Sequence, residues 1–239
     1  MNTVKFNKKN TLVIAHRGLS GLEVENTNAA FIAAGNRSYY GVETDIRVTA
    51  DGKYVLNHDG DLNRIAGENI VIEENKLEEI QAVILLDKDG TKNRLDLRVC
   101  TLDNYVSICK KYNKHCVLEL KSDFSDSEIE DIIKIINDLN YLNEVTFISF
   151  NYENLLKIKK ILPLQSAQFL FDKFSDDLIA KLVADGIDVD VYYKALSKEK
   201  IKELHSLGLK INCWTVDNAQ DAEKLAKWGV DYITSNILE

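Results

Sequence analysis

The feature that most constrains the fold is the alternation of two kinds of segment along the chain. Short apolar runs rich in β-branched residues are separated by amphipathic segments with helical spacing, a pattern typical of βαβ units and a parallel sheet. The roughly eight short runs span residues 11–15, 41–48, 116–121, 145–149, 164–171, 187–191, 209–215 and 232–235. The helical segments span residues 26–36, 102–111, 127–139, 152–161, 176–184, 197–207 and 219–227. Since (β/α)8 barrels commonly run to about 250 residues, a chain of 239 residues suits an α/β fold of this kind, a TIM barrel.

The ends of the predicted helices carry suitable capping residues. Ser125 and Ser197 each precede a helical segment, where a side-chain oxygen can accept an orphan backbone N–H. Gly186, Gly208 and Gly229 each follow a helical segment and precede an apolar run. Glycine there suits the left-handed residue that ends many helices. We therefore predict one barrel domain over residues 1–239.

One segment breaks this rhythm. Residues 61–98 are charged and irregular, and they separate the second predicted strand from the third by more than a standard loop. We interpret them as a small insertion after strand two, on the face where barrel enzymes shape their specificity. A plain solvated excursion is an equally good interpretation.

Charge and cysteine usage narrow the choice of partners. The net charge of −8 should repel nucleic-acid backbones and anionic membranes, so we expect no nucleic-acid partner. A phosphodiester substrate would need local positive charge or a bound cation. The cysteines form no C-x-x-C pair and lie mostly in apolar stretches, which favours buried reduced thiols of a cytosolic protein over a zinc site or a disulfide; they are Cys100, Cys109, Cys116 and Cys213.

The beginning of the sequence has no pattern of a targeting segment. Residues 1–10 are polar, and the apolar run at residues 12–15 is too short for a signal peptide or a membrane-spanning helix. We expect a cytoplasmic protein without stable membrane insertion, and the sequence leaves monomer and homodimer open.

Three carboxylates are candidates for a metal site. Glu43 and Asp45 are two residues apart in one predicted strand and share a face, and Glu119 lies in the next barrel strand. Carboxylates that share a site repel one another unless a cation lies between them. Oxygen donors without a thiolate or histidine cluster suit Mg²⁺ or Ca²⁺ better than zinc. The alternative is that Glu43 and Asp45 pair with surface lysines.

Two of the four histidines are candidates for proton transfer. His16 ends the first predicted strand, and His58 follows a short extended run at residues 54–57. Hydrolysis of a phosphodiester needs one group to take a proton and another to give one. Each could instead be a structural residue, which is how we interpret His115 and His205.

Arg17 and Lys121 supply positive charge at the same predicted face. A guanidinium can grip two phosphate oxygens, and an ammonium offers a mobile point charge. Either side chain could instead serve as an ion-pair partner of the carboxylates.

Taken together, these residues resemble the glycerophosphodiester phosphodiesterase family. The resemblance covers essentially the whole chain and rests on the order and spacing of the motifs His16-Arg17-Gly18, Glu25-Asn26-Thr27, Glu43-Thr44-Asp45, His58-Asp59, Glu119-Leu120-Lys121, Cys213-Trp214-Thr215-Val216-Asp217 and Asp231-Tyr232-Ile233-Thr234-Ser235-Asn236. It implies a (β/α)8 barrel with an insertion after the second strand. It also implies hydrolysis of glycerophosphodiesters, such as glycerophosphocholine or glycerophosphoethanolamine, to glycerol 3-phosphate and an alcohol.

The resemblance also implies a role for each site residue. These are acid and base for His16 and His58, ligation of Mg²⁺ or Ca²⁺ for Glu43, Asp45 and Glu119, phosphate binding for Arg17 and Lys121, and the aromatic wall of a glycerol pocket for Trp214. Trp214 could instead be a core residue at the barrel top. Glu25 either supports Arg17 or the substrate, or is a first-turn acid favourable to the helix dipole.

The chain departs from the family pattern in two places. Val24 stands where the family usually has proline, and Ser235-Asn236 follows Thr234 where the family usually ends its last strand in Thr-Asp. Both departures bear on specificity more than on activity.

Three other functions compete with this one. A lysophospholipase D or a phosphatidylinositol phospholipase would use the same barrel but needs an apolar entry. A noncatalytic binding homologue would keep the barrel and lose the chemistry. A sugar-phosphate isomerase or aldolase would need a Schiff-base lysine or a glycine-rich phosphate loop after strands seven and eight, and we find neither.

Overall fold

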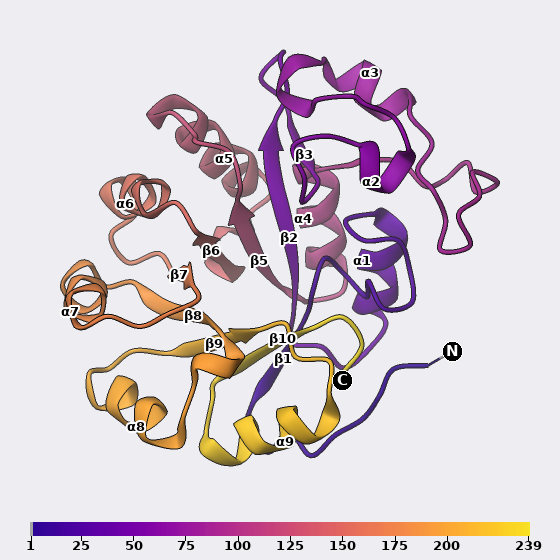
Figure 1. Cartoon of the computed structure of the whole chain (residues 1–239). Coiled ribbons are helices and arrows are strands. Elements are labelled where there is room, and N and C mark those ends of the chain that lie inside the picture. Colours follow the sequence, from indigo (N-terminus) through magenta and orange to yellow (C-terminus); the bar gives the residue numbers. More distant parts are fainter. Residues whose placement is uncertain (1) are drawn as a thin grey trace.

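The computed structural model describes residues 2–239, except for the side chain of Asp176. Its centre is a closed barrel of parallel strands with helices around it (Figure 1). The barrel strands are β1 (Leu12–Ala15), β2 (Gly41–Val48), β5 (His115–Leu120), β6 (Val145–Ser149), β7 (Ala167–Phe171), β8 (Asp188–Tyr192), β9 (Ile211–Trp214) and β10 (Tyr232–Ser235). The barrel closes because β1 pairs in parallel with both β10 and β2. The predicted (β/α)8 barrel is therefore confirmed.

The helices follow the strands in the predicted order. The outer helices are α1 (Asn28–Gly35), α4 (Leu102–Lys111), α5 (Asp126–Asp138), α6 (Tyr152–Ile161), α7 (Asp176–Asp185), α8 (Lys198–Ser206) and α9 (Ala219–Trp228), with short 3₁₀ turns η2 (Leu142–Glu144) and η3 (Tyr193–Ala195). Ser125 and Ser197 cap α5 and α8 by accepting backbone N–H groups. The three glycines predicted to end helices all have positive φ, of 62°, 81° and 96°. One boundary is wrong by three residues, because Leu164 is fully exposed before β7 begins at Ala167.

The barrel has two apolar regions. Residues such as Val189 and Val191 face outward from β8 and belong to the large core beneath the helices. A second, smaller cluster consists of Ile14 on β1, Val117 on β5, Ile148 on β6 and Leu170 on β7. Because side chains alternate along a strand, this cluster lies inside the barrel.

The segment after β2 is more structured than predicted. β3 (Tyr54–Leu56) pairs antiparallel with β2, and β4 (Cys100–Thr101) pairs antiparallel with β3. Between them lie α2 (Asn63–Ala66), η1 (Ile72–Glu74) and α3 (Leu77–Ala82), at the upper right of Figure 1. The segment has its own buried cluster, which includes Leu62, Ile72, Ile80, Leu85 and Leu97. It is neither irregular nor a plain solvated excursion, and its helices are too short to show an apolar period.

Two further expectations can be compared with the structure. All four cysteines are buried and free. Within residues 2–239, no helix has both the length and the apolar character needed to cross a bilayer.

Candidate active site

The turn after β1 is shaped by its sequence. Arg17 and Gly18 both have left-handed backbones, with φ of 53° and 76°. A Cβ at position 18 would lie 2.7 Å from the backbone of Ala30 in α1, so only glycine fits there. Thr27 caps α1 by accepting the N–H of Ala30. This tight approach of α1 to the end of β1 holds His16 and Arg17 at the carboxyl end of the barrel.

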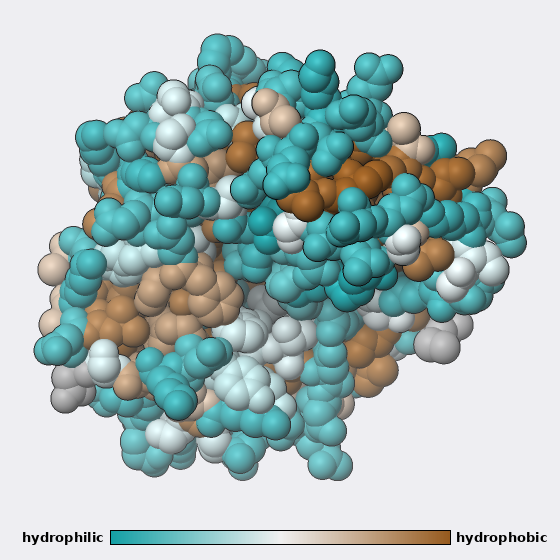
Figure 2. Space-filling view, turned by 45° about the horizontal axis from the view of Figure 1, so that its top comes forward, coloured by the Kyte–Doolittle hydropathy of each residue, from teal (hydrophilic) through white to brown (hydrophobic). Residues whose placement is uncertain are grey.

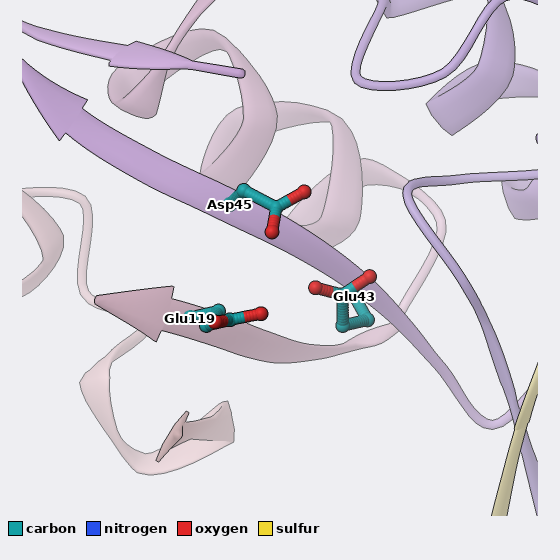
Figure 3. A group of neighbouring side chains, drawn as sticks. All are labelled: Glu43, Asp45 and Glu119. Atoms are coloured by element: carbon teal, nitrogen blue, oxygen red, sulfur yellow. The ribbon is translucent and has the colours of Figure 1, made fainter. Parts of the chain in front are cut away.

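Glu43, Asp45 and Glu119 converge on one point at this end (Figure 3). Asp45 on β2 is directly in register with Glu119 on β5. Each of the three side chains offers an oxygen, and these oxygens all lie within 4.8 Å of one another. All three residues are buried, with exposed fractions of 2%, 1% and 8%.

The crowding perturbs the ionisation of these carboxyl groups. Burial and the charges of Asp45 and Glu119 raise the pKa of Glu43 well above its usual value. Burial, with a contribution from Asp45, raises the pKa of Glu119 to about 7. Burial alone would raise the pKa of Asp45 too, but Arg17 and other cationic neighbours lower it below the usual value. The protein's own cations thus compensate only part of the negative charge.

One oxygen of the cluster is left without a hydrogen bond. Asp45 Oδ2 accepts from Asn26 Nδ2 at 2.8 Å, but the buried Oδ1 has no partner among the described residues. Lys121 Nζ lies 3.8 Å from that oxygen and only 2.9 Å from Glu119 Oε1. An unpaired carboxylate oxygen among three converging acids fits the oxygen-donor set of a hard divalent cation. Their role as metal ligands stays a prediction.

His16 is held in one tautomer by residues of the last strand and loop. Its Nδ1 lies 2.8 Å from Asn236 Oδ1. Asn236 donates its amide N–H to Asp217 at 2.6 Å, which fixes the amide with its oxygen toward His16. Nδ1 must therefore carry the proton, and Nε2, 3.9 Å from Glu43, carries the lone pair. Burial, assisted by Arg17, lowers the pKa of His16 to about 4.

His58 has a different partner. Its Nδ1 lies 2.8 Å from Asp59 Oδ1, and the other oxygen of Asp59 accepts from Arg64 Nε at 2.6 Å. Burial lowers the pKa of His58, and the carboxylate of Asp59 works against that shift. Of the two histidines, His58 thus has the closer carboxylate partner, at 2.8 Å against 3.9 Å for His16 and Glu43.

Arg64 was not predicted from the sequence, although it joins the two sides of this region. Glu25 Oε1 accepts from Arg17 at 2.9 Å and from Arg64 at 2.8 Å. Since Arg64 also binds Asp59, ion pairs run without a break from Arg17 through α2 of the insertion to Asp59, which is hydrogen-bonded to His58. Glu25 is not among the residues of the pocket wall, so its predicted contact with substrate stays a prediction.

The two histidines open onto one pocket together with Glu43 and Glu119. The apolar and aromatic residues of the wall are Ile148, Phe150, Leu170 and Trp214, and its further polar residues are Asp190, Thr215 and Thr234. The ring of Trp214 meets the rings of Phe150 and Tyr192 at centroid distances of 5.6 Å and 5.8 Å. In the space-filling view, an apolar patch lies left of the central hollow, on the side of α6 and α7 (Figure 2). The pocket thus has a charged side and an aromatic side.

The remaining histidines lie outside this pocket. His115, at the start of β5, bonds to Thr146 at 2.8 Å, and His205, in α8, bonds to Asp231 at 2.9 Å. These contacts agree with the structural interpretation of both residues.

The fold and the residues at its mouth define an enzyme built on a (β/α)8 barrel, with a buried acidic cluster beside two histidines. The sequence pattern of the glycerophosphoryl diester phosphodiesterase family matches residues 16–238. A glycerophosphodiester phosphodiesterase of Caldanaerobacter subterraneus subsp. tengcongensis is 30% identical over 230 residues, which cover 95% of this chain and 94% of that protein. One of Bacillus subtilis is 26% identical, over 94% of this chain and 83% of its own. The chain therefore belongs to the glycerophosphoryl diester phosphodiesterase family.

Solved structures agree with this assignment. A glycerophosphodiester phosphodiesterase from Parabacteroides distasonis superposes with a TM-score of 0.80 at 26% identity, covering 96% of this chain and 94% of that one. An Oleispira antarctica phosphodiesterase, solved in complex with the product sn-glycerol-3-phosphate, has the same fold, with a TM-score of 0.87 at 23% identity and coverage of 98% and 96%.

Proposed function

We propose that this protein hydrolyses glycerophosphodiesters, such as glycerophosphocholine or glycerophosphoethanolamine, to glycerol 3-phosphate and an alcohol. The observation that carries the proposal is the buried cluster of three carboxylates, two of which, Glu43 and Glu119, line the pocket that both histidines share. The product found in the Oleispira antarctica relative adds support.

Glu43, Asp45 and Glu119 are the residues that would hold a divalent cation, Mg²⁺ or Ca²⁺. When bound, such an ion supplies positive charge that neutralises the charge growing on phosphate oxygens. The unpaired Asp45 Oδ1 and the raised pKa of both glutamates support this role, because a cation would satisfy the oxygen and relieve the repulsion.

Arg17 would bind the phosphate. Its NH1 is tied to Glu25, and its buried Nε makes no hydrogen bond among the described residues but lies 3.4 Å from Asp45 Oδ2. A guanidinium held at two of its nitrogens in this way is oriented, and it would donate from the third to an anionic ligand. Lys121, beside Glu119 at 2.9 Å, would add a second positive charge near the phosphate.

The hydrogen bonds of the two histidines support a different task for each. His16 has a neutral amide partner and a free Nε2 lone pair, so it would take the proton of the nucleophile as general base. That nucleophile is water, or the glycerol 2-hydroxyl if a cyclic phosphate forms first. His58 has a carboxylate partner that favours its protonated form, so it would give a proton to the departing alcohol.

The other wall would bind the organic part of the substrate. Trp214 lines the pocket and would form the aromatic wall against glycerol. Glu25 would act from behind, by orienting Arg17 at 2.9 Å.

We propose that residues 1–239 act as one domain, with the small-molecule substrate as partner and without nucleic acid. The four buried free thiols fit a reducing compartment, so we place the protein in the cytoplasm. Monomer and homodimer are both compatible with a site formed by one chain.

An assay with glycerophosphocholine tests the proposal. The purified protein should release glycerol 3-phosphate, lose this activity in EDTA and regain it with Mg²⁺ or Ca²⁺. Lysophosphatidylcholine serves as the second substrate, and its preferred cleavage would favour the lysophospholipase D alternative. Binding of glycerophosphocholine without turnover at any metal concentration would favour the noncatalytic homologue.

A further inference from the structure

Asp190 is a buried acid in the pocket wall that the proposed chemistry does not use. It lies in the middle of β8 (Asp188–Tyr192), between Val189 and Val191, whose side chains belong to the outer core. Strand alternation therefore directs Asp190 into the barrel. Its exposed fraction is only 1%, and it forms part of the same pocket as Glu119 and Trp214.

One oxygen of Asp190 is satisfied by a fixed partner. Asn212 donates its amide N–H to Asp190 Oδ2 at 3.2 Å. The same amide donates to Gln168 Oε1 at 3.4 Å, while its oxygen accepts from Thr234 Oγ1 at 3.2 Å. These contacts fix the orientation of Asn212, so Asp190 Oδ2 is an acceptor in this network.

The other oxygen has no partner. Asp190 Oδ1 is buried and makes no hydrogen bond with any described residue. Most buried polar atoms in native proteins are paired, so an unpaired one that belongs to a pocket wall calls for an explanation. A ligand atom that enters the pocket would supply the missing partner.

The surroundings favour a neutral carboxyl group. Burial raises the pKa of Asp190 well above its usual value, and the charge of Glu119 adds to this shift. Within residues 2–239, no lysine, arginine or histidine forms an ion pair with Asp190. A protonated carboxyl group with Oδ2 as acceptor presents an O–H donor at Oδ1.

We propose that Asp190 is a specificity-determining residue that hydrogen-bonds a hydroxyl group of the substrate's glycerol through Oδ1. The inference rests on the proposed function, and it names the residue that recognises the glycerol part of the substrate. Trp214 supports the geometry, because its Nε1 lies 3.4 Å from the backbone oxygen of Asp190 and places the ring on the same wall. The ring would cover the carbon chain while the acid meets a hydroxyl, the usual division between apolar lining and a few polar groups in a ligand pocket.

Two substitutions separate a neutral hydrogen-bonding role from a charged one. Asp190→Asn has the shape of the neutral acid, with an amide N–H at the Oδ1 position and an oxygen to accept from Asn212. Asp190→Leu removes both functions. Asp188→Asn is the matched control, since it makes the same change on the same strand two residues away, outside the residues of the pocket.

The test compares two ligands by calorimetry on the metal-loaded protein. One is sn-glycerol 3-phosphate, and the other is 1-propyl phosphate, which has the same phosphate and three carbons but neither hydroxyl. Asp190→Leu should weaken binding of glycerol 3-phosphate by about 10-fold to 100-fold and leave propyl phosphate within about 2-fold. Asp190→Asn and Asp188→Asn should bind both ligands within about 3-fold of the wild type, as expected where a hydrogen bond is kept or never involved. Binding of propyl phosphate also shows that each variant is folded.

Several results would overturn the inference. If Asp190→Asn loses as much affinity as Asp190→Leu, Asp190 is ionised and accepts from the hydroxyl, and the inference of a neutral, donating carboxyl group is wrong. If Asp190→Leu weakens both ligands equally, its effect is structural. If the wild type prefers glycerol 3-phosphate and Asp190→Leu keeps that preference, the inference fails while the proposed function stands. A wild type that binds neither ligand would contradict both.

Discussion

The mouth of the barrel has two halves that differ in the kind of side chain that lines them. On the half formed by β1, β2, β5 and the insertion, charged side chains bind one another, as in the ion pairs from Arg17 through Glu25 and Arg64 to Asp59. On the half formed by β6 to β9, aromatic rings meet edge to face, and Phe150 has an exposed fraction of 48%. Figure 2 shows an apolar patch on that side of the hollow, and another at the upper right of the view.

This difference indicates a division of labour. Charged groups that are already held by neighbours need little reorganisation when charge develops in a transition state. Aromatic faces that are partly exposed can cover the organic part of a ligand. We therefore expect substitutions in the charged half to lower kcat, and substitutions in the aromatic half to raise KM.

The largest effect is expected in the charged half. His16→Asn and His58→Asn should each lower kcat by about 10²-fold to 10⁴-fold, because each removes a proton-transfer group. Metal affinity should remain close to that of the wild type, which calorimetry can check. His205→Asn, a change in α8 outside the pocket, is the control. A His16 or His58 variant with near-native turnover would contradict the assignment.

A smaller effect is expected in the aromatic half. Trp214→Ala removes the ring that lines the pocket between Phe150 and Tyr192. Loss of aromatic contacts of this kind costs about 1 kcal/mol, so KM for glycerophosphocholine should rise roughly 5-fold to 10-fold with kcat nearly unchanged. Steady-state kinetics measure both quantities. A fall in kcat as large as that of the histidine variants would erase the distinction between the halves.

Arg64 tests whether the insertion supports the charged half. Arg64→Met removes its bonds to Glu25 and Asp59 but keeps much of the side-chain length. Because Arg64 is 47% exposed, we expect a decrease in kcat of only about 2-fold to 5-fold, in keeping with the modest worth of exposed ion pairs. The decrease should be larger at low salt. An effect on KM alone would place Arg64 in substrate binding.

Glu239 serves as a control that belongs to neither half. It accepts hydrogen bonds from Thr3 and from the backbone of Ser38. Burial alone would raise the pKa of Glu239, but these hydrogen bonds outweigh it and lower the pKa to about 2. A lowered pKa in the folded state means that the ionised form stabilises the protein at neutral pH, and that this contribution is lost as pH falls from about 4.5 toward 2.

We therefore expect Glu239→Gln to lower the unfolding free energy by about 1 kcal/mol at pH 7. The difference from the wild type should shrink below pH 4.5, while kcat and KM stay unchanged. Thermal unfolding at several pH values measures this. A difference in stability that grows on acidification would contradict the sign.

The sequence predicts the barrel and the charged half well because their signals are periodic or clustered in motifs. The strand and helix runs give the order of the elements, and two-residue spacing in a strand places Glu43 and Asp45 on one face. The insertion is less predictable, because α2 and α3 have only four and six residues. Arg64 therefore could not be placed beside Glu25 and Asp59.

The sequence contains a pattern that could have singled out Asp190. Asp188 and Asp190 show the same two-residue spacing within an apolar run that singled out the carboxylates of β2. The role of Asn236 is harder to foresee, since its bond to His16 joins residues 220 positions apart. Contacts of that kind depend on the closure of the barrel, which local pattern does not describe.

Divalent-cation binding tests the central claim most directly. Calorimetric titration of the wild type with Mg²⁺ and Ca²⁺ should show one site, and Glu43→Gln, Asp45→Asn and Glu119→Gln should each weaken it by about 10-fold or more, because each removes a charged oxygen ligand. Asp123→Asn, whose side chain is 83% exposed, is the control and should bind like the wild type. Three cluster variants that bind either ion as tightly as the wild type would contradict the claim that this acidic cluster is the metal site.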